Sequence, residues 1–316
     1  MGIYDHKTHF AGKTISGWVP GDPIPDPATT IPRISATDLY GQNEVNGEEN
    51  FLRFLADPAS KACSGLALGI WEETTENYLD HVVELLVQHH DHFQHLTTLF
   101  LGEISQEESE ISWIELGDLS ELFQAYPQLE HFGLRGNACS AYHLQLGTLH
   151  SEHLKTLVIE SGSMHSSVVH DILRSQLPAL EHLELWTGSA NYGANCTVED
   201  FAPLFTDNLF PNLRYLGLLN SEITNELAIA LSQSSLLERL HTLDLSLGTL
   251  SDTGAAALLN CPAIRKLAKL DLHHHFCSEE MIQQLQALPI EVDVSWREER
   301  EDWGDGVERR FVAIAE

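Results

Sequence analysis

Three aspartates and one histidine recur at spacings that fit no catalytic motif but could bind a positive charge. Asp244, Asp271 and Asp293 are 27 and 22 residues apart, and His273 lies two residues after the second of them. Neighbouring carboxylates repel one another and raise each other's pKa until a cation or a basic partner neutralises them. The alternative interpretation is a solvated face that Lys269 and His273 partly neutralise. A further alternative is an enzyme or metal-dependent site made of Asp244, Asp271 and His273.

A second group of side chains could anchor a protein partner through apolar contacts. Trp186 and Leu219 occupy the same position in two neighbouring copies of a repeat, with His182 and Glu184 in the first copy and Tyr215 in the second. Tryptophan and tyrosine supply much of the binding energy of protein interfaces. We expect an exposed aromatic patch here. The alternative is that a terminal arm of the chain covers it.

The 18 histidines include two clusters that could bind zinc or nickel. Residues 89–95 hold four histidines at the end of a predicted helix, where imidazolium also suits the helix dipole. His273, His274 and His275 follow a predicted strand, in which successive side chains point to opposite faces. We therefore predict no metal site and no cofactor. The sequence contains no GxGxxG, Walker, HExxH or GxSxG motif, so we predict that the protein is not an enzyme.

A repeat must position these residues. The pattern L-x-x-L-x-L, with other apolar residues in some copies, occurs nine times between Cys63 and Val294, every 22 to 33 residues. In five copies another apolar residue follows five positions later, as Leu250 follows Leu245. The alternating core of the pattern predicts a short strand, and the spacing after it predicts a helix. The helices are expected to begin at capping residues: Thr197, Thr224, Ser251 and Ser278.

A repeated strand and helix predict an α/β fold, a leucine-rich-repeat solenoid shaped like a horseshoe. The parallel sheet would form the concave face and the helices the convex face. In this register the third, fifth and seventh positions of each repeat face the concave side. The residues that we expect to bind a partner occupy these positions: His182, Glu184, Trp186, Tyr215, Leu219, Asp244, Asp271, His273 and Asp293.

The segment LHTLDLSLGTLSDTGAAAL, residues 240–258, resembles the ribonuclease-inhibitor-type leucine-rich repeat. The asparagine or cysteine usual at the ninth position of that repeat is present at Asn137 but is replaced in other copies. The chain also resembles a family of bacterial cytoplasmic leucine-rich-repeat proteins, through HKTHFAG at residues 6–12 and RFVAIAE at residues 310–316. This resemblance implies the fold and a cytoplasmic location but no chemistry.

The ends of the chain differ from the repeats. Five of the 12 prolines lie between residues 19 and 32, which predicts an extended N-terminal arm over residues 1–32. We expect one leucine-rich-repeat domain over residues 33–316. Its predicted parts are an N-terminal cap at about 33–62, the repeats at about 63–294 and a C-terminal cap at about 295–316. The caps would contain a strand at 33–37, a helix at 50–57 and a final edge strand at 311–315.

The composition excludes some classes of partner. The chain has 316 residues, with 47 acidic and 17 basic ones, and a formal net charge of −30. Such a chain lacks the lysines and arginines that bind phosphates, so we expect neither nucleic acid nor an anionic membrane as a partner. Five scattered cysteines without a CxxC motif favour a reducing compartment. We read no signal peptide at the start and no apolar run long enough to span a membrane, and we expect a cytoplasmic protein.

These observations favour a non-catalytic module for protein–protein interaction. The concave strand face would bind the partner, and its aspartates favour a basic one. The resemblance to ribonuclease inhibitors, which bind basic enzymes, points the same way. The enzyme or metal-dependent protein with a site at Asp244, Asp271 and His273 stays open as the alternative. So does a purely structural subunit of a larger assembly.

Overall fold

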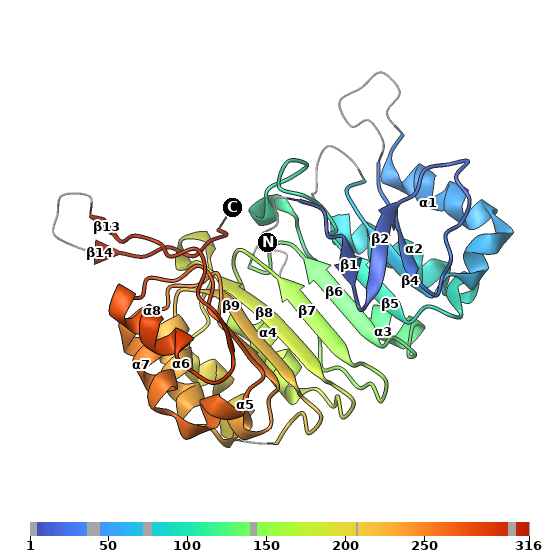
Figure 1. Ribbon diagram of the computed structural model, residues 1–316. Helices are drawn as coiled ribbons and strands as arrows, with labels where there is room; N and C mark the ends of the chain where they lie inside the picture. The colour runs from blue at the N-terminus through green and yellow to red at the C-terminus, as the bar shows by residue number, and fades with distance from the viewer. Residues whose placement is uncertain are drawn as a thin grey trace.

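A sheet of twelve strands runs through the computed structural model in the order of the sequence, from β1 to β12 (Figure 1). The structure describes residues 5–36, 45–71, 78–139, 144–206, 208–302 and 308–315. Every neighbouring pair of strands is parallel except the first, β1 with β2, which is antiparallel. The strands are β1 (His9–Phe10), β2 (Lys13–Gly17), β3 (Thr30–Ile34), β4 (Gly65–Leu68), β5 (Thr98–Leu101), β6 (His131–Arg135), β7 (Thr156–Glu160), β8 (His182–Gly188), β9 (Tyr215–Ser221), β10 (Thr242–Asp244), β11 (Lys269–Asp271) and β12 (Glu291–Asp293).

The helices lie along the outer side of the curved sheet (Figure 1). Near the C-terminus a short antiparallel pair, β13 (Glu301–Asp302) and β14 (Glu308–Arg309), lies outside the main sheet. The helices are α1 (Gly47–Ala56), α2 (Tyr78–Gln88), α3 (Leu122–Ala125), α4 (Ser166–Arg174), α5 (Ala202–Thr206), α6 (Thr224–Ser232), α7 (Asp252–Asn260) and α8 (Glu279–Gln286). No helix in the described part of the chain is long and apolar enough to cross a membrane.

The predicted repeat register is confirmed by the pairing of the strands. The fourth repeat position of each copy is paired with the fourth position of the next, from β4 through β12. This row of apolar residues packs between the sheet and the helices, and all but the last of its members are fully buried: Leu66, Leu99, Phe132, Leu157, Leu183, Leu216, Leu243, Leu270 and Val292. Burying such a row is the main source of stability of a solenoid. The fold is a leucine-rich-repeat solenoid.

Three of the four predicted helix starts are correct, since Thr197, Ser251 and Ser278 each directly precede a helix. The Ser278 hydroxyl accepts a hydrogen bond from the Met281 N–H, and Thr197 begins a short helical segment in which its N–H and hydroxyl both donate to Asp200. Thr224 is instead the first residue of α6, because its hydroxyl donates to the Ser221 carbonyl and does not cap the helix. Ser251 precedes α7, but its hydroxyl donates to Asn225 Oδ1 at 3.2 Å.

The segment expected to be an extended N-terminal arm contributes strands to the sheet. β2 pairs with β3 over four residues, and β3 pairs with β4, so this segment extends the parallel sheet beyond the first repeat. The cap strand expected at 33–37 begins earlier, at Thr30, and the expected cap helix is α1. The prolines at 20–27 lie in the connection between β2 and β3. The division of the whole chain into caps and repeats stays a prediction.

The edge strand expected at residues 311–315 is wrong. These residues form no strand, and their segment crosses the carboxyl ends of the strands of the C-terminal half, close to the N-terminal segment (Figure 1). The Ala313 N–H donates to the carbonyl of Leu247, and the Ile314 N–H donates to the side chain of Asn220. We refer to residues 310–315 as the tail segment.

Candidate functional site

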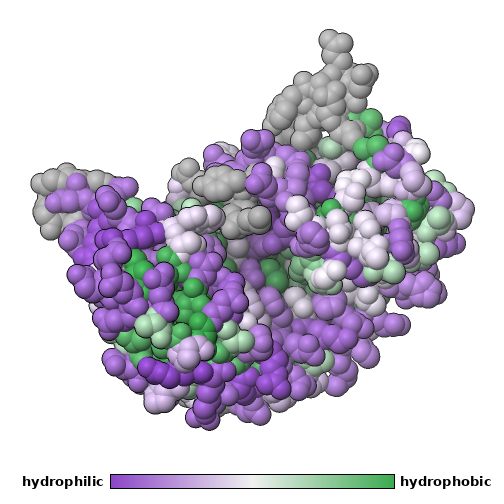
Figure 2. All heavy atoms as spheres, viewed as in Figure 1, coloured by the Kyte–Doolittle hydropathy of each residue, from purple (hydrophilic) through white to green (hydrophobic). Residues whose placement is uncertain are grey.

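A cavity of about 580 Å³ lies on the concave side of the sheet, between the strands and residues 5–9. Figure 2 shows that the molecule is hollowed between its N-terminal and C-terminal repeats, and that hydrophilic residues cover most of the visible face. Five successive strands, β6 to β10, contribute apolar or charged side chains to its lining. Its lining from the repeats consists of Arg135, Glu160, Glu184, Trp186, Leu219, Asp244, Leu247 and His273. We call this cavity the concave pocket.

Glu103 holds the N-terminal segment in place over the concave pocket. Its fully buried carboxylate accepts hydrogen bonds from the Lys7 N–H at 2.7 Å and from the imidazole of His6 at 3.1 Å, and it forms an ion pair with Arg33. Burial alone would raise the pKa of Glu103, but the hydrogen bond from His6 and the charge of Arg33 lower it to about 2. The carboxylate is therefore ionised at neutral pH and anchors residues 6 and 7.

A buried ion pair forms one wall of the pocket. Arg135 Nε lies 2.7 Å from Glu160 Oε2, and the side chains of both residues are at most 2% exposed. Lys7 Nζ lies 2.5 Å from the other oxygen of the same carboxylate. Arg135 also donates to the Ile104 carbonyl at 2.7 Å. Glu160 thus has two cationic partners, one from the adjacent strand and one from the N-terminal segment.

Glu184 and Asp244 flank a glycine on the strand between them. In the register of the sheet, Glu184 on β8 and Asp244 on β10 both lie beside Gly217 on β9. A side chain at Gly217 would collide with Leu219 and lie in tight contact with Tyr215 and Glu184. The glycine therefore leaves room for the neighbouring side chains to lie flat over the strand and keeps the two carboxylates on one open floor.

Tyr215 bridges the two carboxylates. Its hydroxyl donates to Asp244 Oδ2 at 2.8 Å and lies 3.4 Å from Glu184 Oε2. Its ring stacks on the imidazole of His182, with ring centres 3.8 Å apart and planes at 4°. Burial, together with the charges of Glu184 and Asp244, raises the pKa of the Tyr215 phenol well above its usual value. The phenol therefore stays a neutral donor.

The two carboxylates differ in their ionisation. Burial and the charge of Asp271 raise the pKa of Asp244 to about 6. Burial also opposes ionisation of Glu184, but hydrogen bonds from His182 and Trp186 and the charge of Lys7 lower its pKa on balance. Both groups are ionised or partly ionised at neutral pH, although neither has a strong countercharge in contact.

The predicted aspartate column is formed by direct neighbours in the sheet. Asp244 pairs with Asp271, and Asp271 pairs with Asp293. Each aspartate also accepts a hydrogen bond from the backbone N–H two residues later, at 2.9–3.2 Å. This bond closes a turn at the end of its strand, so the column has a structural role in the repeat in addition to any role in binding.

Asp271 is the best-compensated member of the column. His273 Nδ1 lies 2.7 Å from one of its oxygens, and Lys269 Nζ lies 2.9 Å from the other. Burial opposes ionisation, but these hydrogen bonds lower the pKa of Asp271 to about 2. The other ring nitrogen of His273, Nε2, is buried and has no hydrogen-bond partner among the described residues. An aspartate–histidine pair with a free nitrogen beside a cavity is an arrangement found in general bases.

Side chains of three of the predicted residues come close enough to share a metal ion. One donor atom each from Asp271, His273 and Asp293 lies within 4.8 Å of the others. Asp271, however, already has Lys269 and His273 as partners, and a lysine ammonium in contact opposes the binding of a metal cation. The three histidines at 273–275 do not converge on one site, since His275 is buried and its Nε2 donates to the Val294 carbonyl.

The predicted exposure of the aromatic patch is wrong. Trp186 and Leu219 are neighbours on β8 and β9, as expected, but only 4% and 5% of their surfaces are exposed. Ile314 from the tail segment and Ile111 cover them. Tyr215 is partly exposed, and its hydroxyl lies instead between the carboxylates of Glu184 and Asp244. The alternative of a covering terminal arm is therefore the one that the structure adopts.

The predicted set omitted Lys7 and the Arg135–Glu160 pair. Arg135 and Glu160 occupy the seventh position of neighbouring repeats, so their pairing across adjacent strands could have been predicted from the register. The contact of Lys7 with Glu160 had no such signal, because it joins a non-repeating segment to the sheet.

The chain is similar to solved structures of other proteins. The crystal structure of a Bacteroides fragilis protein from a structural genomics consortium superposes with a TM-score of 0.74 and 35% sequence identity, over 81% of this chain and 71% of that chain. An internalin from Listeria monocytogenes matches with a TM-score of 0.36 and 14% identity, over 76% of this chain and 70% of that chain. No protein-family model and no curated protein matches the chain.

Proposed function

Because the chain belongs to the family of leucine-rich-repeat proteins that includes the Bacteroides fragilis protein, we propose that it is a non-catalytic protein-interaction module. A solenoid presents a long curved surface suited to binding a protein. The partner is a basic protein, and it binds on the concave strand face. Its contacts include the third- and fifth-position residues of the C-terminal half: His182, Glu184, Tyr215, Asp244, Asp271 and Asp293, with His273 at the edge.

The observation that carries this proposal is the pair of carboxylates on the floor of the concave pocket. Glu184 and Asp244 have hydrogen bonds from neutral groups, but neither forms an ion pair with a lysine or arginine among the described residues. Glu160, at the seventh position of the preceding repeat, does have such partners in Lys7 and Arg135. Lys7 shows how an ammonium group is seated on this face. A lysine or arginine of a partner would neutralise the remaining pair in the same manner.

Loss of the two carboxylates is expected to abolish capture of the partner. The tagged chain and its Glu184→Gln, Asp244→Asn double variant would be recovered from the cells that produce the protein, and the co-purifying proteins quantified by mass spectrometry. We expect a basic protein whose recovery falls at least tenfold with the variant, because removing one side of a buried charge pair weakens an interface strongly.

A matched variant controls for the change in net charge. Glu226 on α6 and Glu280 on α8 are exposed on the convex side, so Glu226→Gln with Glu280→Gln removes the same two charges from another surface. Its recovery of the partner should equal that of the unmodified chain. Equal loss in both double variants would refute a specific role of the concave pocket.

A cytoplasmic location also belongs to this proposal. All five cysteines are free thiols, and burial raises the pKa of Cys63, Cys196 and Cys277 to about 11–12, which keeps these three thiols protonated. Free thiols suit a reducing compartment. The ribonuclease-inhibitor subtype of the repeat likewise stays a prediction.

The closeness of Asp271, His273 and Asp293 favours a metal-dependent protein as the second candidate. Elemental analysis of protein purified without chelator would decide between the two. We expect no stoichiometric metal, since Lys269 already compensates Asp271. A zinc or manganese content near one ion per chain, lost in the Asp293→Asn variant, would favour the second candidate.

A further inference from the structure

The last four repeats share an unusual backbone conformation at one position. The eighth residue of each repeat has a positive φ although none of the four is a glycine: Asn220 at 50°, Leu247 at 62°, His274 at 56° and Trp296 at 56°. Asparagine tolerates this conformation, but leucine and tryptophan rarely adopt it. We call these four residues the rim ladder, because they follow one another along the carboxyl ends of β9 to β12.

Positive φ at each of these positions has a common structural consequence. It turns the chain at the end of the strand, so a rung can direct its side chain or its carbonyl group toward the rim of the sheet. Strained residues of this kind concentrate at ligand clamps and other functional sites. A row of four of them, spaced by the distance between strands, forms a regular edge along which an extended segment can lie.

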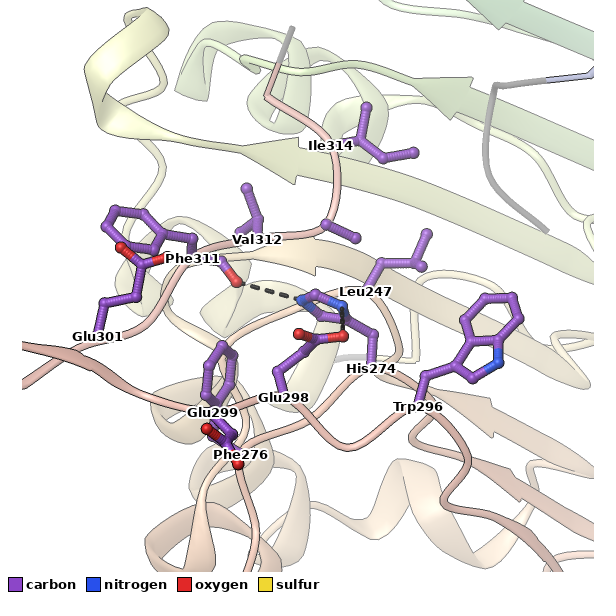
Figure 3. A pocket seen from close by; sticks show the side chains of 11 residues that line it. Leu247, His274, Phe276, Trp296, Glu298, Glu299, Glu301, Phe311, Val312 and Ile314 are labelled. Atoms are coloured by element: carbon purple, nitrogen blue, oxygen red, sulfur yellow. Dashed lines mark hydrogen bonds and ion pairs between the residues drawn. The ribbon is translucent and has the colours of Figure 1, made fainter.

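The tail segment lies along three of the four rungs. The Asn220 side chain pairs with Ile314 as a strand would, donating to its carbonyl at 2.5 Å and accepting from its N–H at 3.0 Å. The carbonyl of Leu247 accepts from the Ala313 N–H at 2.8 Å. His274 donates from Nε2 to the Phe311 carbonyl at 3.2 Å, as Figure 3 shows. These contacts are mainly with backbone atoms, and are therefore open to other sequences.

One side chain of the tail segment is buried against side chains of the sheet. Ile314 is 4% exposed and packs in a small apolar cluster with Ile111, Trp186, Leu219 and Leu247, separate from the main core. The cluster gives the groove a specificity pocket for one aliphatic side chain. An extended segment that binds here is therefore recognised by its backbone along the rungs and by an apolar residue at the Asn220 end.

The tail segment leaves the fourth rung unfilled. A cavity of about 370 Å³ lies between the tail and Trp296, with Phe276, Leu247 and Phe311 among its walls. In Figure 3 the Trp296 indole and the Phe311 ring lie at opposite sides of this cavity. Trp296 is 60% exposed. A segment that reached the fourth rung would bury this tryptophan, which the tail does not do.

The open side of the groove is acidic. Glu298, Glu299 and Glu301 line the cavity beside the fourth rung. The tail segment itself begins with a basic residue, and Arg310 donates to the Thr249 carbonyl at 3.2 Å. A basic residue next to apolar ones is thus the pattern that already occupies the groove.

We propose that the rim ladder is a docking groove for an extended segment of a partner protein with basic and apolar residues, and that residues 310–315 occupy it in cis until such a segment displaces them. The proposal does not rest on the acidic floor of the concave pocket. A second copy of this chain is not the expected occupant, because its tail is identical and would contact only the same three rungs. The competitor must gain contacts at Trp296.

A released tail makes the groove accessible to a peptide in trans. The probe is a fluorescein-labelled peptide with the sequence of residues 308–315, and the protein is the full chain with Ile314→Asp, which places a carboxylate in the apolar cluster. A tethered tail competes at an effective concentration of about a millimolar. We therefore expect the peptide to bind the Ile314→Asp chain at least tenfold more tightly than the unmodified chain, by fluorescence anisotropy.

Two controls make the result specific. Leu52→Asp introduces the same carboxylate at an exposed leucine on α1, and the peptide should bind this variant as weakly as the unmodified chain. A peptide with aspartate in place of its isoleucine should bind no variant. Binding of the probe to none of the chains, or equally to all of them, would overturn the proposal. If the unmodified chain eluted as a dimer and the Ile314→Asp variant as a monomer, the groove would be assigned to a second copy instead.

A measurement on the unmodified chain covers the case in which Ile314→Asp does not fold. Hydrogen exchange should show the amides of residues 313 and 314 exchanging at least a hundredfold faster than amides in β8 and β9, because the tail opens without unfolding the sheet. Equal protection of the tail and the strands would mean that the tail is a fixed part of the fold, and would overturn displacement.

Discussion

The Glu160→Met variant is expected to be less stable than the unmodified chain by about 3–5 kcal/mol. The substitution keeps the volume of the side chain but leaves the guanidinium of Arg135 buried without its carboxylate. Only the hydrogen bond to the Ile104 carbonyl would remain. The free energy of unfolding in urea at pH 7 measures the loss, and a difference below about 1 kcal/mol would contradict this account of the pair.

Two further variants separate charge burial from packing. The double variant Arg135→Met with Glu160→Met should recover most of the lost stability, since replacing both members of a buried pair with apolar groups is often neutral. Lys7→Met should cost about 1 kcal/mol or less, because the Lys7 side chain is 26% exposed and solvent screens its ion pair. If Lys7→Met were as damaging as Glu160→Met, the N-terminal segment and not Arg135 would be the main partner of the carboxylate.

The repeating part of the molecule could be predicted from the sequence because its contacts repeat. A residue at the fourth position meets the fourth position of the next repeat, so Leu216 is paired with Leu183 and Leu243. The same reasoning correctly placed Asp244 beside Asp271. Both statements follow from the period of the apolar pattern and the alternation of side chains along a strand.

The non-repeating contacts could not be predicted in this way. Ile314 binds Asn220, 94 residues earlier, and Lys7 reaches Glu103, 96 residues later. No periodicity relates these positions, and each contact depends on where a terminal segment crosses the sheet. For this reason the sequence placed Trp186 correctly on the strand face but did not show that Ile314 would bury it.

The positive φ angles of the rim ladder could not be predicted from the sequence either. A glycine at such a turn would have been a signal, but leucine and tryptophan rarely adopt positive φ and so predict the opposite conformation. Their alignment at one repeat position becomes visible only from the backbone angles of Leu247 and Trp296. The geometry that the neighbouring repeats impose overrides the backbone preference of these residues.

The Asp244→Asn variant is expected to be more stable than the unmodified chain above pH 6, by about 2 kcal/mol. Burial and Asp271 raise the pKa of Asp244 to about 6, from an ordinary value of 3.8. A group with a raised pKa in the folded state stabilises the fold while it is protonated, and this contribution is lost as the pH rises from about 4 through 6. Asparagine resembles the protonated form at every pH. The gain in unfolding free energy should therefore grow between pH 4 and 7 and then level off.

The Asp271→Asn variant is expected to change the stability in the opposite direction. His273 and Lys269 lower the pKa of Asp271 to about 2, so its ionised form stabilises the fold at neutral pH and this contribution is lost only as the pH falls toward 2. The variant should be less stable at pH 7 by about 1–2 kcal/mol. A gain for Asp244→Asn that did not change with pH would show that its charge is not the cause.

The expected gain in stability also bears on the function of Asp244. If the unmodified chain keeps a destabilising carboxylate on the floor of the concave pocket, a basic partner that binds there would remove the penalty, and binding would be strongest where Asp244 is ionised. Asp244→Asn should then combine higher stability with weaker capture of the partner. Such a combination is typical of functional sites. A stable variant that still captured the partner fully would leave Asp244 with only its role in closing the strand end.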